Sequence, residues 1–447
     1  MDRLTLPPAP PPRDHSRCIY VCHSTHENDA IYAENIAEYC SGVGIDCQRL
    51  PFDADKSLLL QALDDEPDAV IGFNSQLDRA WLGEQPFLSI AADRQVPVVQ
   101  WILDHPSARW PEFSSSTTEN SRYVFHSRYS ERYFRQFCLP KSTTSAVMGV
   151  GPNKRSRVAE SDPHEFLRRD YPCLIPLNLA RLGRSIEQLE NDIVAVGPKS
   201  RDAVVEAFLL ARHDLIQPIE VHACSVLNGL GISLPAREFH GFVQMLEEKV
   251  QAFRRLHVLK IARDYPVLIQ SDDTARSYAD GGIAFFEEGV RMGRTLSQMP
   301  QARAVVSVSH LNDMIHDRTL NGLNAGCVNI VEDSIAHRAY FQAQANALFF
   351  RYDDDSLRQC LELVCNRPRA VYHVAANGFA LRDQPPFRFG GYHNFVAPRV
   401  PASTEGDSLR PVHRTPKEVV RISKSVKLLS PKDGCGYTFD HGAEQAE

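Results

Sequence analysis

Short apolar runs alternate with helix-like stretches through the first third of the chain. Residues 18–22 (CIYVC) are typical of a buried strand, and residues 28–40 repeat small apolar side chains at helical spacing before Gly42 ends the pattern. Further helices are expected near residues 54–65 and 77–94. The other apolar runs of this part lie at residues 45–50, 68–73, 97–103, 122–126 and 145–150. This alternation predicts a parallel sheet covered by helices on both faces.

The same alternation returns in the second half of the chain. Residues 149–157 are expected to form a linker, and residues 184–263 are expected to be helical, with breaks at positions such as Pro218 and Pro235. Further strands are predicted at residues 172–179, 266–270, 302–309, 327–331 and 346–350. These runs predict a second parallel α/β unit.

The sequence therefore predicts an α/β protein with two Rossmann-like parallel-sheet domains that face a cleft, and with a helical insertion. We expect a flexible Pro-rich leader at residues 1–15 and an N-terminal domain at residues 16–155. The C-terminal domain is expected at residues 156–400, with the insertion at about residues 200–255. A C-terminal tail is expected at residues 401–447.

Overall composition narrows the classes of function. The 447 residues carry a net charge of −7, which argues against a nucleic-acid partner. The 11 Cys include no C-x-x-C pair, so we expect reduced, buried thiols and no metal site. The chain begins without an apolar signal segment, and no apolar run reaches the roughly 20 residues of a transmembrane helix. We therefore expect a cytoplasmic protein.

Ligands of open parallel sheets bind beyond the carboxyl ends of the strands, so the residues that follow each apolar run are the first candidates for chemistry. In the N-terminal domain these include Asp104 and His105, which follow the run at residues 97–103 directly. His23 and His126 follow two other runs.

The segment at residues 307–334 is the most informative part of the C-terminal domain. A strand ends in polar residues, a helix opens at Asp317 and Arg318, and a second strand follows. Two adjacent strand ends with a helix N-terminus between them can hold an anion and a ribose. The candidate nucleotide-binding residues are Ser309, His310, Asn312, Arg318, Asn321, Glu332 and Asp333.

At this point the sequence resembles a known family. The motifs SVSHLN, RTLNGLNAGCVNIVED and LFFRYDDDSL resemble the C-terminal domain of the CgeB-like glycosyltransferases, a branch of the GT-B superfamily. In the N-terminal domain, VPVVQWILDHP is similar to a strand and Asp-x-Pro turn that faces the cleft in this family. The segment PCLIPLNLARLGRS resembles the first strand of the family's C-terminal domain. The resemblance covers residues 16–367.

The resemblance implies transfer of a sugar from a nucleotide-diphosphate sugar to an acceptor, without a metal and with no cofactor beyond the donor. Helix amides and basic side chains would stabilise the leaving diphosphate, with Arg318 first among them and Arg276, Arg181 and Arg184 behind it. Asp104 or His105 would deprotonate the acceptor. The acceptor is left open between a glycan, a protein and a small molecule.

One residue departs from the family pattern. Asn321 stands where the family usually carries an acidic residue that binds the ribose or donor sugar. An amide can bond a hydroxyl but supplies no charge-assisted bond. A catalytically inactive GT-B-like scaffold that binds a nucleotide or a glycan is therefore the alternative hypothesis. A two-lobed binding protein for sugars or amino acids is a third.

Overall fold

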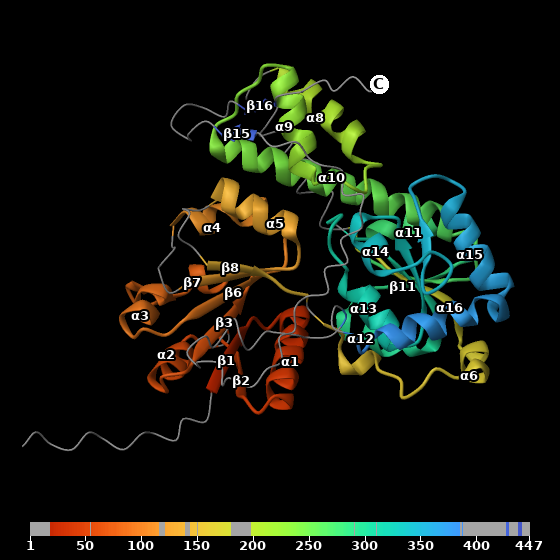
Figure 1. The fold of residues 1–447 in the computed structure, drawn as a ribbon, viewed down its shortest axis with the longest axis horizontal. Coiled ribbons are helices and arrows are strands. Elements are labelled where there is room, and N and C mark those ends of the chain that lie inside the picture. Colours follow the sequence, from red (N-terminus) through yellow and green to blue (C-terminus); the bar gives the residue numbers. More distant parts are fainter. Residues whose placement is uncertain are drawn as a thin grey trace, which may run out of the picture.

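Two parallel six-stranded sheets, each with helices packed against it, form the body of the protein (Figure 1). The structure is a computed structural model, and it describes residues 18–53, 55–115, 121–138, 144–149, 151–179, 198–289, 291–309, 311–384 and 387, with the backbone of 426–428 and 437–439. None of the helices in these ranges is long and apolar enough to cross a membrane. The expected α/β class with two Rossmann-like parallel sheets is confirmed.

The first sheet has the strand order β2-β1-β3-β6-β7-β8. Its strands are β1 (Cys18–His23), β2 (Asp46–Pro51), β3 (Ala69–Phe73), β6 (Val98–Ile102), β7 (Ser121–Phe125) and β8 (Thr144–Val147). Its helices are α1 (Glu27–Gly42), α2 (Ser57–Asp64), α3 (Phe87–Asp93), α4 (Trp110–Ser115) and α5 (Arg128–Tyr133), with shorter turns at Leu77–Arg79, Pro106–Arg109 and Phe134–Cys138.

Strand side chains of the first sheet alternate between two helical layers. Ile19 and Val21 pack in the same apolar cluster as Ala33 and Ile36 of α1, whereas Tyr20 packs with the residues of α2 and α3. Because successive side chains of a strand point to opposite faces, a continuous apolar run serves both layers. This is the reason that the apolar runs predicted the strands correctly.

The helix expected near residues 77–94 is wrong in its first half. A 3₁₀ turn at Leu77–Arg79 is followed by the hairpin strands β4 (Trp81–Leu82) and β5 (Gln85–Pro86), and α3 begins only at Phe87. Gly83 has a φ of 64° in the hairpin turn, and Pro86 caps α3 with an extended backbone. Both residues favour a turn over a continuous helix, because glycine adopts positive φ readily and proline cannot donate a helical hydrogen bond.

The second sheet has the order β11-β10-β9-β12-β13-β14. Its strands are β9 (Tyr171–Pro176), β10 (Leu268–Ser271), β11 (Phe285–Glu288), β12 (Ala302–Ser307), β13 (Val328–Glu332) and β14 (Leu348–Phe350). Its helices are α6 (Pro163–Arg168), α11 (Asp273–Ala279), α12 (Met292–Gln298), α13 (Asp317–Asn324), α14 (Ile335–Tyr340), α15 (Ser356–Asn366) and α16 (Pro368–Leu381), with turns at Lys154–Ser156 and Met299–Gln301. Strands β15 (Val426–Leu428) and β16 (Tyr437–Phe439) pair antiparallel.

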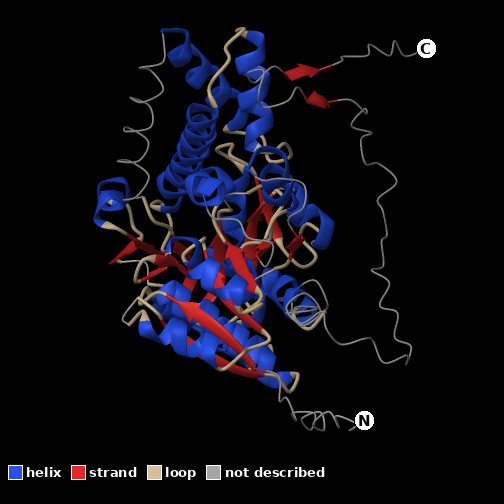
Figure 2. Ribbon diagram, turned by 90° about the vertical axis from the view of Figure 1, so that its left-hand side faces the viewer, coloured by secondary structure: helices blue, strands red, loops and turns tan. Residues whose placement is uncertain are grey.

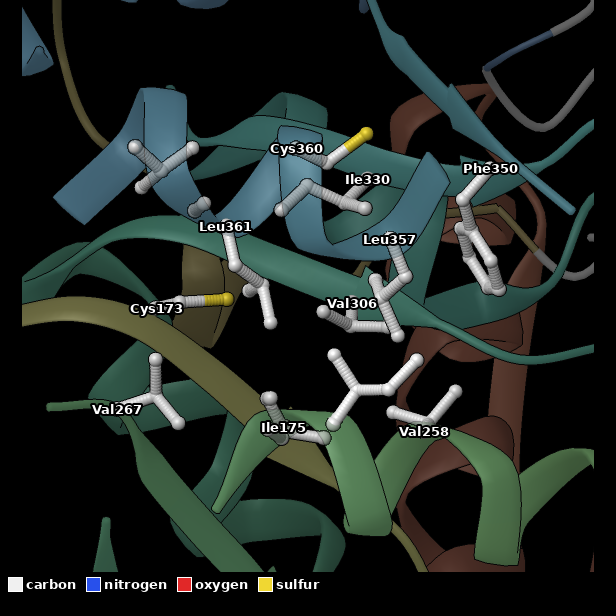
Figure 3. Close-up of a cluster of buried hydrophobic side chains, with 14 of the residues drawn as sticks. Cys173, Ile175, Val258, Val267, Val306, Ile330, Phe350, Leu357, Cys360 and Leu361 are labelled. Atoms are coloured by element: carbon white, nitrogen blue, oxygen red, sulfur yellow. The ribbon is translucent and has the colours of Figure 1, made fainter. Parts of the chain in front are cut away.

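The core of the second domain is apolar and tightly filled. Figure 3 shows Cys173 and Ile175 of β9 facing Val306 of β12, with Leu357 and Leu361 of α15 above them. All five side chains are completely buried. The Cys173 thiol lies among them as a small apolar group, and burial raises its pKa well above the ordinary value. Cys173 is thus buried, as we expected of the cysteines.

The helical insertion consists of α8 (Pro198–Ala211), α9 (Ile219–Gly229) and α10 (Ala236–Ala262). Figures 1 and 2 show these helices above the strands of both sheets. Helix α9 follows Pro218 and α10 follows Pro235, so the sequence breaks mark the true helix boundaries. Helix α10 ends at Ala262, inside the helical range expected at residues 184–263 but beyond the expected end of the insertion near residue 255, because Val258 and Leu259 pack in the core of the second domain.

The insertion bridges the two domains. Tyr133 of α5 packs in one apolar cluster with Phe239, Phe242 and Leu246 of α10. The Tyr133 hydroxyl also bonds His240 Nδ1 at 2.7 Å. Because the other end of α10 lies in the second core, this helix of 27 residues spans about 40 Å and connects both halves.

A buried polar network joins the domains at the linker. Asn153 Nδ2 donates to Asn35 Oδ1 of α1, and the Asn153 amide donates to Asn321 Oδ1 of α13 over 2.7 Å. Ser156 Oγ also donates to Asn321 Oδ1, at 2.9 Å, and Asn324 Nδ2 donates to the Asn153 carbonyl at 3.0 Å. We call these five residues the linker network. It fixes the linker against one helix of each domain.

Candidate active site

Two adjoining hollows lie between the first domain, the second domain and α10. The first has a volume of about 360 Å³ and is lined mainly by strand ends of the first domain. The second has a volume of about 310 Å³ and is lined mainly by α10, α12 and the start of α13. Asn28, Tyr32, Asp104, His316 and Asp317 line both hollows, so the two form one continuous cleft.

Arg318 and Arg255 bring two guanidinium groups to the second hollow. Arg318 Nη1 is buried and makes no hydrogen bond within the described residues, and neither guanidinium forms an ion pair there. Arg255 Nη1 donates to the Asn178 carbonyl at 2.6 Å, whereas its Nε is buried and has no hydrogen-bond partner in the described part of the chain. Burial, and next the charge of Arg318, lower the pKa of Arg255 to about 10. Two mutually repelling cations side by side in a cleft are suited to a doubly charged anion.

The backbone amides at the start of α13 are already hydrogen-bonded, whereas an anion site was expected there. The Arg318 amide donates to Asp317 Oδ1 at 2.8 Å and to His316 Nδ1 at 3.2 Å, and the amides of Thr319 and Leu320 donate to the His316 carbonyl. Side chains and backbone of the same turn therefore occupy the first amides of the helix. The expectation that these amides would meet a diphosphate is corrected. Arg255 brings a second positive group to the same hollow.

Asp317 ties the two domains together inside the cleft. The Tyr32 hydroxyl of α1 donates to Asp317 Oδ2 at 3.2 Å, and His316 pairs with the same carboxylate. Burial alone would raise the pKa of Asp317, but the adjacent His316 and Arg318 hold it well below its usual range. Asp317 therefore remains ionised, and it orients Tyr32 at the point where the two hollows meet.

Asp104 lies at the junction of the two hollows. Its Oδ2 accepts a hydrogen bond of 2.5 Å from Arg109 Nη2. Its backbone is fixed by Asn74, whose Oδ1 accepts from the amides of Leu103 and Asp104 at 2.7 and 3.2 Å. Asn74 adopts a φ of 46°, which is uncommon for a residue other than glycine and is typical of strained functional loops. The loop thus presents the Asp104 carboxylate to the cleft.

His105 lies outside both hollows, so we drop it as a candidate base. Its side chain is 1% exposed. Its Nδ1 bonds Ser107 Oγ at 2.8 Å, and its ring packs against Tyr133 with the ring centroids 4.6 Å apart. Burial lowers the pKa of His105 to about 3, so the imidazole is neutral. His105 is buried and does not face the cleft because its side chain caps the 3₁₀ turn that Pro106 begins. This capping directs the ring into the protein.

Two strand-end candidates of the second domain bind their own loops. Ser309 Oγ donates to the Leu311 carbonyl at 2.9 Å, and the Ser309 amide donates to Glu332 at 3.0 Å. Glu332 is completely buried and also accepts from the Tyr352 hydroxyl. Neither Ser309 nor Glu332 lines the two hollows. His310 lies outside the described residues.

The other candidates of the second domain are also engaged elsewhere. Asn312 Nδ2 donates to the carbonyls of Asp214 and Gln217 at 3.1 and 2.7 Å, which holds the insertion in place. Asp333 forms ion pairs with Arg338 and Arg351 at 2.5 and 2.8 Å. Asn321 borders the second hollow, but both polar atoms of its side chain are bonded, Oδ1 in the linker network and Nδ2 to the Asp317 carbonyl at 2.8 Å.

Of the weaker cationic candidates, Arg276 is exposed and pairs with Asp273 and Glu288, both at 3.2 Å. Arg181 and Arg184 lie outside the described residues. Within the part of the chain that the structure describes, no group of three or more His, Cys, Asp or Glu side chains is arranged to hold a metal ion.

Similarity to known proteins is found among solved structures and not at the level of sequence families. No protein-family model matches the sequence, and no curated protein matches it. Among solved structures, HepE of Anabaena in complex with UDP-glucose is 10% identical, with a TM-score of 0.45 over 84% of this chain and 96% of that chain. The sucrose-phosphate synthase of Thermosynechococcus elongatus is 10% identical, with a TM-score of 0.46 over 85% and 96%. The T4 phage protein BGT in complex with UDP-glucose is 8% identical, with a TM-score of 0.44 over 82% and 94%.

At these identities no property of the neighbours is carried over to this chain. The fold is defined by the two parallel sheets themselves. The resemblance to the CgeB-like branch is not confirmed and stays an inference.

Three residues of α10 that border the cleft were missed in the sequence. Glu247, Gln251 and Arg255 line the second hollow and are spaced by four residues, so they follow one face of the helix. Gln251 Nε2 donates to Glu247 Oε1 at 2.9 Å. Burial, and next the charge of Asp104, raise the pKa of Glu247 well above its usual value. The recurrence of a polar residue at every fourth position could have indicated this face of the helix. The apolar residues of the same helix were more prominent and indicated only packing.

The buried carboxyl group of Glu220 in α9 is expected to make the free energy of unfolding depend on pH. The carboxylate is 5% exposed, and burial raises its pKa from 4.5 to about 7, although Arg132 lies 3.6 Å away. The other groups that face it are the neutral His105 and the carboxylate of Asp313. Because the folded pKa is the higher one, the protonated form stabilises the fold below pH 4.5, and this stabilisation is lost as the pH rises through 7.

We therefore expect the variant Glu220→Gln to be more stable than the wild type at pH 8, by about 3 kcal/mol, and to differ much less at pH 5. Urea unfolding at the two pH values measures the difference. An equal difference at both values would show that the Glu220 carboxyl does not titrate in this range.

Proposed function

We propose that the protein transfers a sugar from a nucleotide-diphosphate sugar to an acceptor hydroxyl across the cleft. The single observation that supports this most is the pair Arg318 and Arg255 in a hollow between two parallel α/β domains. Both side chains are partly buried, and neither forms an ion pair within the described residues. A diphosphate supplies the two negative charges that would satisfy them. The resemblance to CgeB-like glycosyltransferases belongs to the same proposal.

In the proposed reaction the acceptor oxygen forms a bond to the anomeric carbon of the donor sugar. The bond between this carbon and the diphosphate oxygen breaks, and the diphosphate leaves with the electron pair. Arg318 and Arg255 stabilise the charge that develops on it, as preorganised groups in a dry site do most effectively. Asp104, at the junction of the two hollows, takes the proton of the acceptor hydroxyl. In this scheme neither a metal nor a cofactor beyond the donor takes part.

The first test is binding of the donor. We expect one class among UDP, GDP and TDP sugars to raise the melting temperature of the protein, because a ligand present at 100 times its Kd stabilises the folded state by about 2.7 kcal/mol. CMP sugars, which carry one phosphate, are the comparison and are expected to bind more weakly. Release of the free nucleoside phosphate then measures turnover. If none of these nucleotide sugars binds at millimolar concentration, the proposal is wrong.

A second candidate function rests on Asn321. Both polar atoms of its side chain are bonded, so α13 offers no free group at this position to a ribose. This favours the alternative of a GT-B-like scaffold that binds a nucleotide or glycan without catalysis. Nucleotide-sugar binding without release of the nucleoside phosphate, unaffected by Asp104→Ala, would support the scaffold over the enzyme.

A further inference from the structure

The first hollow has the properties of a carbohydrate site. Twelve of its sixteen lining residues are polar or charged, and the apolar contribution is limited to Tyr32, Leu103, Met314 and Ile315. An apolar ring or an acyl chain would bury little apolar surface here and would displace water from many polar groups at a cost. A ligand with many hydroxyl groups replaces that water with hydrogen bonds.

The charges that line the first hollow nearly cancel. The carboxylates are Asp29, Asp104 and Asp317, and the guanidinium groups are Arg79 and Arg109. Burial lowers the pKa of His126 to about 4, so this ring is neutral, and His316 is paired with Asp317. Arg109 is already paired with Asp104. The first hollow therefore has no surplus of positive charge for a phosphorylated or carboxylated ligand.

Hydrogen bonds fix several polar side chains of the first hollow, and two buried polar atoms there have no hydrogen-bond partner within the described residues. Asp29 Oδ2 accepts from Ser24 Oγ at 2.5 Å and from Gln76 Nε2 at 2.6 Å. Gln76 Oε1 and His126 Nδ1 are buried and make no hydrogen bond within the described residues. Buried polar atoms are normally satisfied, and a hydroxyl can both donate and accept, so the two free atoms point to a hydroxylated ligand.

We infer that the first hollow binds the acceptor and that this acceptor is an uncharged carbohydrate, such as the terminal sugar of a glycan. The inference rests on the proposed function, because the first hollow can hold the acceptor only if the adjoining second hollow holds the diphosphate of the donor. Asp104 borders both hollows, so a sugar hydroxyl held by Gln76 and His126 lies near the carboxylate that takes its proton and near the donor.

Direct binding tests the site independently of transfer. Saturation-transfer NMR is measured with neutral saccharides (glucose, maltose, lactose), with glucose 6-phosphate and glucuronic acid, and with p-nitrophenol. We expect a neutral saccharide to bind best, and Gln76→Leu to weaken that binding about tenfold or more. Gln359→Leu, a substitution at an exposed glutamine of α15, is the matched control and is expected to leave saccharide binding unchanged.

Transfer is then measured by mass spectrometry with the donor that binds. Neutral saccharides are expected to be the preferred acceptors, and Gln76→Leu is expected to raise the acceptor KM at least tenfold with the donor-induced thermal shift unchanged. Preferred binding of p-nitrophenol or of an anionic sugar, or no saccharide binding at all, would overturn the inference. Saccharide binding to a protein that binds no nucleotide sugar would overturn the proposed function alone and leave the carbohydrate site standing.

Discussion

The variant Arg318→Ala is expected to lose nucleotide-sugar binding and to reduce kcat/KM by about 10²–10³-fold. The side chain is partly buried at the second hollow, and its Nη1 makes no hydrogen bond within the described residues, so the guanidinium is available for the leaving diphosphate. In a site that excludes water such a contact is worth more than on the surface, because the effective dielectric constant is lower. Calorimetry or thermal shift with the nucleoside diphosphate, together with steady-state kinetics, measures both effects.

Arg276→Ala is the matched control for this prediction. Arg276 is an arginine of the same domain, but it is exposed and paired with Asp273 and Glu288. We expect its removal to leave donor binding unchanged and to alter stability little, since surface ion pairs contribute about 0–1 kcal/mol. Arg318→Lys is expected to recover part of the affinity, because the charge is kept and the planar fork is lost. Unchanged donor binding in Arg318→Ala would refute the assignment of this site.

The variant Asn321→Leu is expected to lower the free energy of unfolding by about 2–4 kcal/mol. Leucine has a similar size but leaves the buried amide of Asn153 without its acceptor and removes the bond from Ser156 Oγ. A buried donor that loses its partner costs about 1–3 kcal/mol by itself, and the helix α13 loses the bond from Asn321 Nδ2 to the Asp317 carbonyl as well. The midpoint of urea unfolding, with the slope checked for change, measures the loss.

Asn366→Leu provides the comparison for this substitution. Asn366 is exposed at the end of α15, where its side chain donates to Glu362 at 2.7 Å. We expect it to change the unfolding free energy by less than about 0.5 kcal/mol, as is usual for surface positions. If Asn321→Leu is as mild as Asn366→Leu, the linker network does not contribute to stability. If it also leaves donor binding unchanged, Asn321 contributes nothing to the donor site.

The sheets and most helices could be predicted from the sequence because their causes are local. Continuous apolar runs mark strands that are buried on both faces, and Pro218 and Pro235 mark the starts of α9 and α10. The strand β11 was missed, since Phe285–Glu288 is a short edge strand with exposed and acidic side chains. It carries neither an apolar run nor a clear alternation.

The candidate site could be predicted only in part. Asp104 was predicted as a site residue because it follows a strand, and Arg318 because it begins a helix. The structure places both in the cleft. The same signal drew attention to Asn312, Glu332 and Asp333, whose side chains bind other parts of the second domain. A strand end specifies which edge of the sheet a residue occupies, but its rotamer and its neighbours decide whether it faces the ligand.

The sequence by itself determined two parallel α/β units, the helical insertion between strands of the second, and the strand edges from which polar groups could reach a ligand. Only the tertiary structure decided which groups meet. Arg255 of α10 joins Arg318 of α13, and Tyr32 of α1 meets Asp317, 285 residues away along the chain. Such pairings depend on how whole domains dock, and this is determined by apolar packing summed over many residues rather than by the short motifs that carry the chemistry.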